Sequence, residues 1–307
     1  MSLIQNILVA TDFSKGADKA VERAALLAAI YQCKRAELIT INEGGKPQTA
    51  FGIKDSVFDA ILRSITETAC EDLRLKAAEL RARYGIEFAC TFRFGQASKE
   101  IINRAEEMDA DLIITGAHER NLLPDFLFGT TTDKLIRLSR RPLLIVKSDS
   151  TADYRHILVL VDFSEDSKQA AKIALSVSPS ASFVFLHACE VEYEGKMHFA
   201  GVDQTVIDGY RLNEYEHARS ALRNVIEELH VPDRLITEHL VFDKPGVAVR
   251  KYAEQANPDL IVVGKHGRSR IEELLIGSVT RETIARTKCD ILVVPPFANR
   301  EHGAFMV

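Results

Sequence analysis

Ile7-Leu-Val-Ala-Thr-Asp12-Phe-Ser14 is a stretch that the chain repeats as Ile157-Leu-Val-Leu-Val-Asp162-Phe-Ser164, at an offset of 150 residues. In both copies an apolar run ends in Asp-Phe-Ser. Because internal repetition at a fixed offset reports a duplicated structural unit, the repeat predicts two equivalent halves in one chain. Asp12 and Asp162 are equivalent residues in this reading.

Two further repeats extend the duplication to the whole chain. Asp111-Leu-Ile-Ile-Thr-Gly116 recurs as Asp259-Leu-Ile-Val-Val-Gly264 at an offset of 148 residues, and Leu143-Leu-Ile-Val146 corresponds to Ile291-Leu-Val-Val294. Residues 147–153 between the halves are mostly polar and lack apolar periodicity, as expected of a linker. The sequence therefore predicts two tandem domains, residues 1–149 and residues 150–307.

Each half alternates short continuous apolar runs with longer amphipathic segments. This pattern is typical of a parallel sheet covered by helices on both faces, so we predict an α/β fold with a five-stranded parallel sheet in each half. One long helix carries an apolar stripe predicted to face the core: Phe58, Leu62, Ile65, Ala69, Leu73, Ala77, Leu80 and Tyr84. The predicted strands lie near residues 5–11, 37–42, 87–93, 111–116 and 142–146, and near 156–161, 182–188, 235–241, 259–263 and 290–294. The predicted helices of the first half lie near residues 15–31, 55–84, 97–108 and 130–139.

Composition excludes several classes of protein. The 307 residues are 46% hydrophobic and 27% charged with a formal net charge of -5, which argues against a nucleic-acid partner for the whole chain. No apolar run reaches the length needed to span a bilayer, and the N-terminal residues do not read as a secretion signal. Five cysteines with no Cys-x-x-Cys pair indicate neither a disulfide framework nor a zinc site. We expect a cytoplasmic protein without a membrane partner.

The loop after the fourth strand of the second half has a spacing that suits an anionic ligand. In open parallel sheets, ligands bind beyond the carboxyl ends of the strands, where the loops after strands one and four meet. The loop reads Gly264-x-x-Gly267, nine residues, and then Gly277-Ser278. We expect the first two glycines to let the backbone approach a ligand and to permit positive φ, and Gly277-Ser278 to open a helix whose free N–H groups attract an anion. A lone Gly-x-x-Gly is better explained by turns, with Ser278 as an N-cap; the complete spacing favours a ligand.

With this loop and the Asp after the first strand, the chain resembles the universal stress protein family. ATP-binding members of that family carry Gly-x-x-Gly-x9-Gly-[Ser/Thr] after the fourth strand and an Asp after the first, and the resemblance covers nearly the whole chain as a tandem pair. It implies an adenine nucleotide alpha hydrolase-like, Rossmann-like fold, and ATP, with or without Mg²⁺, as the ligand of the second half. In the family the Asp lies near adenine and ribose, the Gly-Ser helix start holds the phosphates, and His187-Ala188 aligns with a position that packs on adenine. The implied nucleotide-binding residues are Val161, Asp162, Ala188, Gly264, Gly267, Gly277, Ser278, Val279 and Thr280.

The first half keeps the spacing of the motif but differs from it in residue type. Glu119 occupies the position of Gly267. A carboxylate about 6 Å from a phosphate would oppose binding by about 3 kcal/mol at an effective dielectric near 20, unless the side chain faces outward. Thr130 also begins a Thr-x-x-Asp sequence typical of a capping box. We therefore expect poor ATP affinity in this half, whose weaker candidates are Asp12, Gly116, Gly129 and Thr130.

These features favour a cytoplasmic stress-response or regulatory protein that binds ATP mainly in its C-terminal domain, with the N-terminal domain as a pseudo-symmetric partner. A slow ATP hydrolase or phosphotransferase is the alternative, although the sequence supplies no clear catalytic base and contains no P-loop, Gly-x-Gly-x-x-Gly or Gly-x-Ser-x-Gly motif. A scaffold that binds no nucleotide is a third interpretation.

The final strands of the two halves indicate how the two domains join. Both are apolar, and an apolar strand at a sheet edge requires pairing or cover, so we expect the two to pair and join the domains. The resemblance implies the same arrangement, because single-domain members of the family dimerise through the corresponding strand. A homodimer of whole chains is left open. Residues 190–209, which follow the second strand of the second half, are predicted to form a lid over the nucleotide.

Overall fold

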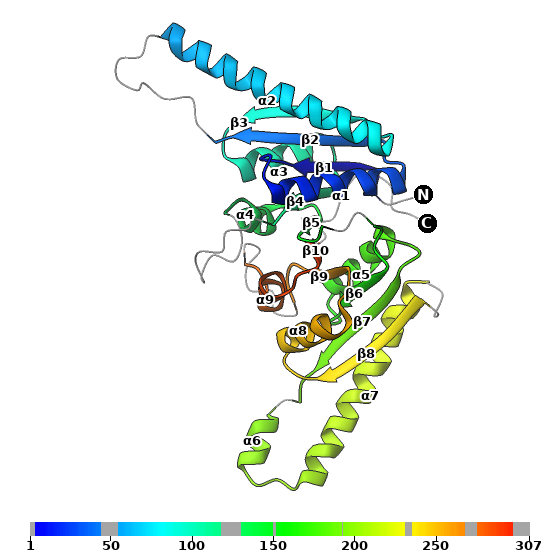
Figure 1. The fold of residues 1–307 in the computed structure, drawn as a ribbon. Helices are drawn as coiled ribbons and strands as arrows, with labels where there is room; N and C mark the ends of the chain where they lie inside the picture. The colour runs from blue at the N-terminus through cyan, green and yellow to red at the C-terminus, as the bar shows by residue number, and fades with distance from the viewer. Residues whose placement is uncertain are drawn as a thin grey trace. The chain divides into compact units, whose positions relative to one another are not determined.

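The computed structural model describes residues 4–43, 55–117, 130–149, 152–191, 193–230, 235–267 and 275–296 (Figure 1). The chain divides into two compact units. Unit 1 is Met1–Asp153 with Asp290–Leu292, and unit 2 is Tyr154–Cys289 with Val293–Val307. Within the described residues, no helix combines the length and the apolar character needed to cross a bilayer.

Unit 1 contains a parallel sheet with the strand order β3-β2-β1-β4-β5. The helices α1 and α2 pack together on one face of the sheet, and α3 and α4 pack together on the other (Figure 1). The elements are β1 (Asn6–Ala10), α1 (Lys15–Tyr31), β2 (Arg35–Asn42), α2 (Asp55–Tyr84), β3 (Phe88–Phe94), α3 (Ala97–Glu107), β4 (Leu112–Gly116), α4 (Thr130–Leu138) and β5 (Leu143–Val146).

Unit 2 repeats this plan with the strand order β10-β9-β6-β7-β8, although of β10 only Val293 and Val294 belong to unit 2. The helices α8 and α9 pack together on one face, and α5 and α7 cover the other. The predicted fold class, α/β with a parallel sheet between helical layers, is confirmed. The elements are β6 (His156–Leu160), α5 (Glu165–Val177), β7 (Ser182–Cys189), α6 (Glu194–Phe199), α7 (Gln204–Glu228), β8 (Ile236–Phe242), α8 (Pro245–Ala256), β9 (Leu260–Gly264), α9 (Ser278–Arg286) and β10 (Asp290–Val294).

The repeated Asp before the fourth strand holds the first strand of each unit in place. In unit 1 the Oδ2 atom of Asp111 accepts hydrogen bonds from the backbone N–H groups of Gln5 and Asn6, at 2.8 and 2.9 Å. In unit 2 Asp259 accepts from Arg155 and His156 at the same two distances. Because each carboxylate satisfies two backbone donors at the start of a strand, the repeated Asp is explained by folding rather than by ligand binding.

The stripe predicted along α2 faces the core only in part. Leu73 and Leu80 are fully buried, whereas the other described members of the stripe are half-buried. A helix of 30 residues is about 45 Å long, but the seven residues of β3 span only about 23 Å. The first turns of α2 therefore extend past the ends of β2 and β3 (Figure 1).

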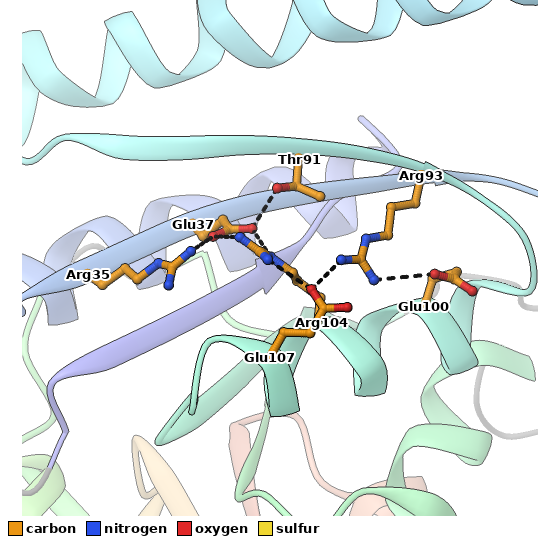
Figure 2. Close-up of polar contacts among 7 residues, drawn as sticks. All are labelled: Arg35, Glu37, Thr91, Arg93, Glu100, Arg104 and Glu107. Carbon is orange, nitrogen blue, oxygen red and sulfur yellow. Dashed lines mark hydrogen bonds and ion pairs between the residues drawn. The ribbon is translucent and has the colours of Figure 1, made fainter.

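A buried carboxylate anchors α3 to the sheet of unit 1 (Figure 2). The Glu37 side chain, which is 0% exposed, accepts hydrogen bonds from Arg104 Nε at 2.5 Å, from Arg104 Nη2 at 2.9 Å and from the Thr91 hydroxyl at 2.6 Å. Arg35 adds an ion pair at 3.0 Å. Burial alone would raise the pKa of Glu37, but hydrogen bonds from Arg104 and Thr91 and the charges of Arg104 and Arg35 lower it below its usual range.

Unit 2 has no such ion cluster at the corresponding positions. The strand registers place Val184 where unit 1 has Glu37, and His239 where unit 1 has Thr91. The ring of His239 packs against Tyr252 of α8, with ring centroids 5.0 Å apart. Apolar and aromatic packing therefore anchors a helix to the sheet in unit 2, as the ion cluster does in unit 1.

Candidate functional site

A cavity of about 810 Å³ lies in unit 2 beyond the carboxyl ends of its strands. This volume falls in the range typical of small-molecule sites. All nine residues expected from the sequence to contact a nucleotide line this cavity: Val161, Asp162, Ala188, Gly264, Gly267, Gly277, Ser278, Val279 and Thr280.

The turn after β6 presents Asp162 to the cavity. Its Oδ1 atom accepts hydrogen bonds from the backbone N–H and the hydroxyl of Ser164, at 3.0 and 2.5 Å. Ser164 is in turn the N-cap of α5, where its side chain accepts from the N–H of Ser167. Asp12 and Ser14 repeat this arrangement in unit 1. The Asp-Phe-Ser sequence therefore has a structural role in both units, as a side-chain turn that leads into a helix cap.

The second Asp162 oxygen faces Gly267. A β-carbon on Gly267 would come within 3.0 Å of Asp162 Oδ2, closer than such atoms normally approach. Glycine at this position therefore lets the two loops meet at the cavity. Positive φ, which we expected at Gly264 and Gly267, is not found, because neither has a φ in the left-handed region. At both glycines a β-carbon would make tight contacts, of 3.2 Å to the His266 carbonyl oxygen from Gly264 and 3.0 Å to Asp162 Oδ2 from Gly267.

Two hydrogen bonds join the loop after β9 to α9. Thr280, 2% exposed, donates its hydroxyl to the carbonyl of Gly264 at 2.8 Å. The N–H of Gly277 donates to the carbonyl of Lys265 at 3.0 Å, and the N–H of Lys265 donates to the carbonyl of Val294 in β10. These bonds fix the start of α9 relative to the strands whose ends form the cavity.

Among the residues that the structure describes, no side chain caps the N-terminus of α9, in contrast to that of α5. Its N-cap is Gly277, which has no side chain to cap the helix, and no acidic residue lies in its first turn. By contrast, Ser164 caps α5, and Glu165 and Asp166 lie in the first turn of that helix. First-turn N–H groups without a capping side chain, together with the helix dipole, favour a negatively charged ligand.

The start of α8 is already covered by a carboxylate of the chain itself. Oε2 of Glu282 lies so close to Gly246, in the first turn of α8, that a β-carbon there would come within 1.9 Å of it. A carboxylate beside a helix N-terminus already provides the negative charge that the helix dipole favours there. The N-terminus of α8 therefore has little remaining attraction for an incoming anion. Of the helices α5, α8 and α9, in the part of unit 2 that the structure describes, α9 is therefore the best suited to bind an anion.

The cavity wall includes residues that the sequence did not single out. Phe163 follows Asp162 with a φ of 65°, which is costly for a residue other than glycine, by about 1–2 kcal/mol. From α7, Glu214 and His217 lie three residues apart, as neighbours on one face of the helix do. From α8, Pro245 and Val249 complete the apolar wall. The repeated Asp-Phe-Ser sequence was a signal for Phe163, whereas nothing in the α7 sequence marked its cavity face.

The cavity has no preformed metal site and no activated thiol among its described residues. No group of three or more His, Cys, Asp and Glu side chains in the described part of the chain is placed to hold a metal ion. Burial, and then the charge of Glu214, raise the pKa of Cys189, which lines the cavity. A raised pKa keeps this thiol protonated and poorly nucleophilic.

Unit 1 differs at the corresponding loop. Gly116 packs directly on the start of α1, where a β-carbon would come within 2.2 Å of the Gly16 carbonyl oxygen. Asp12 and Thr130 are both exposed. Thr130 is the first residue of α4, and Asp133, expected to complete a capping box, forms an ion pair with Arg137 at 2.8 Å. Glu119 and Gly129 lie outside the described residues.

Comparisons with known proteins agree with this fold. An α/β fold with an open helix N-terminus beside the carboxyl ends of its strands is a Rossmann-like ligand-binding architecture. The model of the Universal stress protein family matches the chain twice, at residues 3–147 and 153–295. The chain belongs to the universal stress protein family and contains two tandem copies of its domain.

Individual relatives support this assignment. Universal stress protein MJ0577 of Methanocaldococcus jannaschii is 28% identical over 153 residues, which are 46% of this chain and 94% of that protein. Universal stress protein Rv2005c of Mycobacterium tuberculosis is 25% identical over 195 residues, 60% of this chain and 62% of that protein. The crystal structure of a universal stress protein from Archaeoglobus fulgidus matches the fold with a TM-score of 0.68 and 19% identity, over 95% of this chain and 98% of that one.

Proposed function

We propose that the C-terminal domain, residues 150–307, binds ATP in the cavity of unit 2, and that the chain acts as a nucleotide-binding stress-response protein of the cytoplasm. The observation that carries the proposal is the N-terminus of α9, which no side chain in the described part of the chain caps and which lies in the wall of a cavity lined by the whole predicted residue set. The triphosphate occupies the first turn of α9, at Ser278, Val279 and Thr280. The adenosine part lies toward Val161 and Ala188, at the ends of β6 and β7.

The N-terminal domain, residues 1–149, is proposed to serve as a structural partner with weak or no ATP affinity. The close packing of Gly116 on Gly16 supports this role, because it brings the end of β4 against the start of α1. The pairing of the two final strands and a homodimer of whole chains stay predictions. Any Mg²⁺ would enter with the phosphates, since the described residues offer no preformed metal site.

Titration of the purified full chain tests the proposal. We expect one ATP per chain by isothermal titration calorimetry, with GTP, ADP, AMP and cyclic AMP as comparison ligands. Asp162→Asn keeps the turn to Ser164, because Asn can accept the same hydrogen bond, but it removes the charged acceptor that faces the cavity. We expect it to weaken ATP binding by about 10-fold or more.

Asp12→Asn is the matched control, since Asp12 makes the same turn in unit 1. It is expected to leave ATP binding unchanged. Two ATP molecules per chain, or an equal loss of affinity in both variants, would contradict the assignment to the C-terminal domain.

A single-turnover experiment with Mg-ATP separates the binding protein from the alternative, a slow hydrolase or phosphotransferase. Recovery of unhydrolysed ATP from the complex supports a regulatory binding protein. Hydrolysis that Gly277→Val abolishes would support the enzyme instead.

A further inference from the structure

Phe163 has a backbone conformation that the turn imposes and that a glycine would adopt at lower cost. Its φ is 65°, in the left-handed region, and the hydrogen bond from the Ser164 N–H to Asp162 Oδ1 closes the turn around it. A side chain retained at a strained position in a cavity wall points to a function for that side chain. Phe163 lines the cavity of unit 2.

His187 holds the Phe163 ring. The two rings stack with centroids 4.2 Å apart and planes inclined by 35°. The His187 side chain is 8% exposed, and its Nδ1 atom lies 2.7 Å from the carbonyl oxygen of Val161. Because a carbonyl only accepts hydrogen bonds, Nδ1 carries the proton, and this bond fixes the imidazole plane against which Phe163 rests. The result is a preorganised aromatic surface in the cavity wall.

The turn alone does not explain this aromatic pair. Phe13 occupies the equivalent position in unit 1 with a φ of 59°, so the backbone conformation is common to both units. The strand registers, however, place Thr40 where unit 2 has His187. Phe13 therefore has no stacked imidazole at that position and is 38% exposed. The stacked pair is a feature of the unit that has the open helix N-terminus and the large cavity.

We propose that Phe163, held in place by His187, is the platform on which the aromatic base of the bound nucleotide stacks; this inference rests on the proposed function of the cavity. The cavity wall combines two kinds of chemistry. The first turn of α9 offers N–H groups to phosphate, and Phe163 lines the same cavity as the apolar residues Leu160, Leu186 and Ala188. A planar, weakly polar base suits the second environment, because stacking on an aromatic ring accepts any base and excludes water from its face. Phe163 is then a determinant of specificity for nucleotides over other polyphosphates.

The test compares two ligands and two matched variants by isothermal titration calorimetry. The ligands are ATP and inorganic tripolyphosphate, which carries the phosphates without a base. Phe163→Leu is expected to weaken ATP binding by about 5- to 150-fold and to leave tripolyphosphate binding unchanged. Phe13→Leu, the same change in unit 1, is expected to alter neither, and Phe163→Tyr is expected to retain ATP binding.

The outcomes separate this inference from the proposed function. Two results would show that Phe163 is not the platform for the base while leaving the proposed nucleotide site in place. In the first, the unaltered chain and Phe163→Leu bind ATP equally well. In the second, Phe163→Leu loses affinity for ATP and for tripolyphosphate to the same extent. If the unaltered chain binds neither ligand, the proposed function fails and the platform fails with it. Nuclear Overhauser contacts between the Phe163 ring protons and adenine H2 or H8 provide a second test that needs no variant; their absence in the saturated complex would also overturn the inference.

Discussion

Gly277→Asp should stabilise the protein and abolish most of its ATP binding at the same time. Gly277 is the N-cap of α9, with φ -55° and ψ 146°, a conformation in which an Asp side chain can accept hydrogen bonds from the first-turn N–H groups. A β-carbon there would lie 3.3 Å from the Lys265 carbonyl oxygen, a contact that needs only a small adjustment. Capping and the helix dipole together should add about 0.5–1 kcal/mol to the free energy of unfolding.

The same carboxylate competes with the phosphates for the N–H groups of α9. A phosphate bound at the first turn would lie about 5 Å from the new charge, and the repulsion at an effective dielectric near 20 is about 3 kcal/mol, or about 100-fold in affinity. Gly277→Asn is the control, because it caps the helix without the charge and should lose about 10-fold at most. Calorimetric titration with ATP and thermal unfolding, applied to both variants, give the two quantities.

Higher stability combined with lower ATP affinity in Gly277→Asp would indicate that the phosphates bind at the start of α9. The difference between the Asp and Asn variants should shrink at high salt, because added salt screens the repulsion. Equal ATP affinities for the two variants at low salt would refute the assignment of the phosphates to α9.

Three further predictions concern stability and are checked by urea unfolding. Glu37→Gln should lower the free energy of unfolding by about 3 kcal/mol at pH 7, because it leaves Arg104 without its buried carboxylate. Since the pKa of Glu37 is lowered in the folded state, the stabilisation that Glu37 provides is present above the unfolded-state pKa near 4 and is lost as the pH falls through the folded-state pKa. The difference in the free energy of unfolding between the unaltered chain and Glu37→Gln should therefore shrink at pH 3. A difference independent of pH would contradict the ion cluster. Asp259→Ala should cost about 1–2 kcal/mol and Asp259→Asn less, because the amide keeps one acceptor for the two backbone donors at the start of β6. Thr280→Val should cost about 1–2 kcal/mol by leaving the Gly264 carbonyl without its donor, whereas Thr280→Ser should be close to neutral; equal losses would point to packing instead.

The sequence predicted the elements well because their signals are local. Apolar runs that end at Asp12 and Asp162 mark strands buried on both faces, and the observed β1 and β6 end within two residues of these positions. The Gly-x-x-Gly-x9-Gly-Ser spacing located the end of β9 and the start of α9, which both line the cavity. The turn after β6 meets them there because parallel topology brings the carboxyl ends of β6 and β9 to one edge of the sheet.

What the sequence missed depends on contacts between distant segments. Glu37 lies in a strand that otherwise reads as apolar, and its partner Arg104 is 67 residues away. Glu214 and His217 reach the cavity because of how α7 packs on β7 and β8, which helical periodicity does not specify. The lid predicted over residues 190–209 falls on α6 and the first turns of α7, a pair that Figure 1 shows extending past the strands of unit 2. From this stretch Glu190 lines the cavity, while α6 has no buried residue and contributes none to its wall.

A crystal structure of the full chain with a non-hydrolysable ATP analogue would show where the nucleotide binds. We expect a single nucleotide per chain, with phosphate oxygens about 3 Å from the backbone nitrogens of residues 278–280. Phosphates bound in unit 1, or a cavity in unit 2 that stays without nucleotide at saturating concentration, would contradict this expectation.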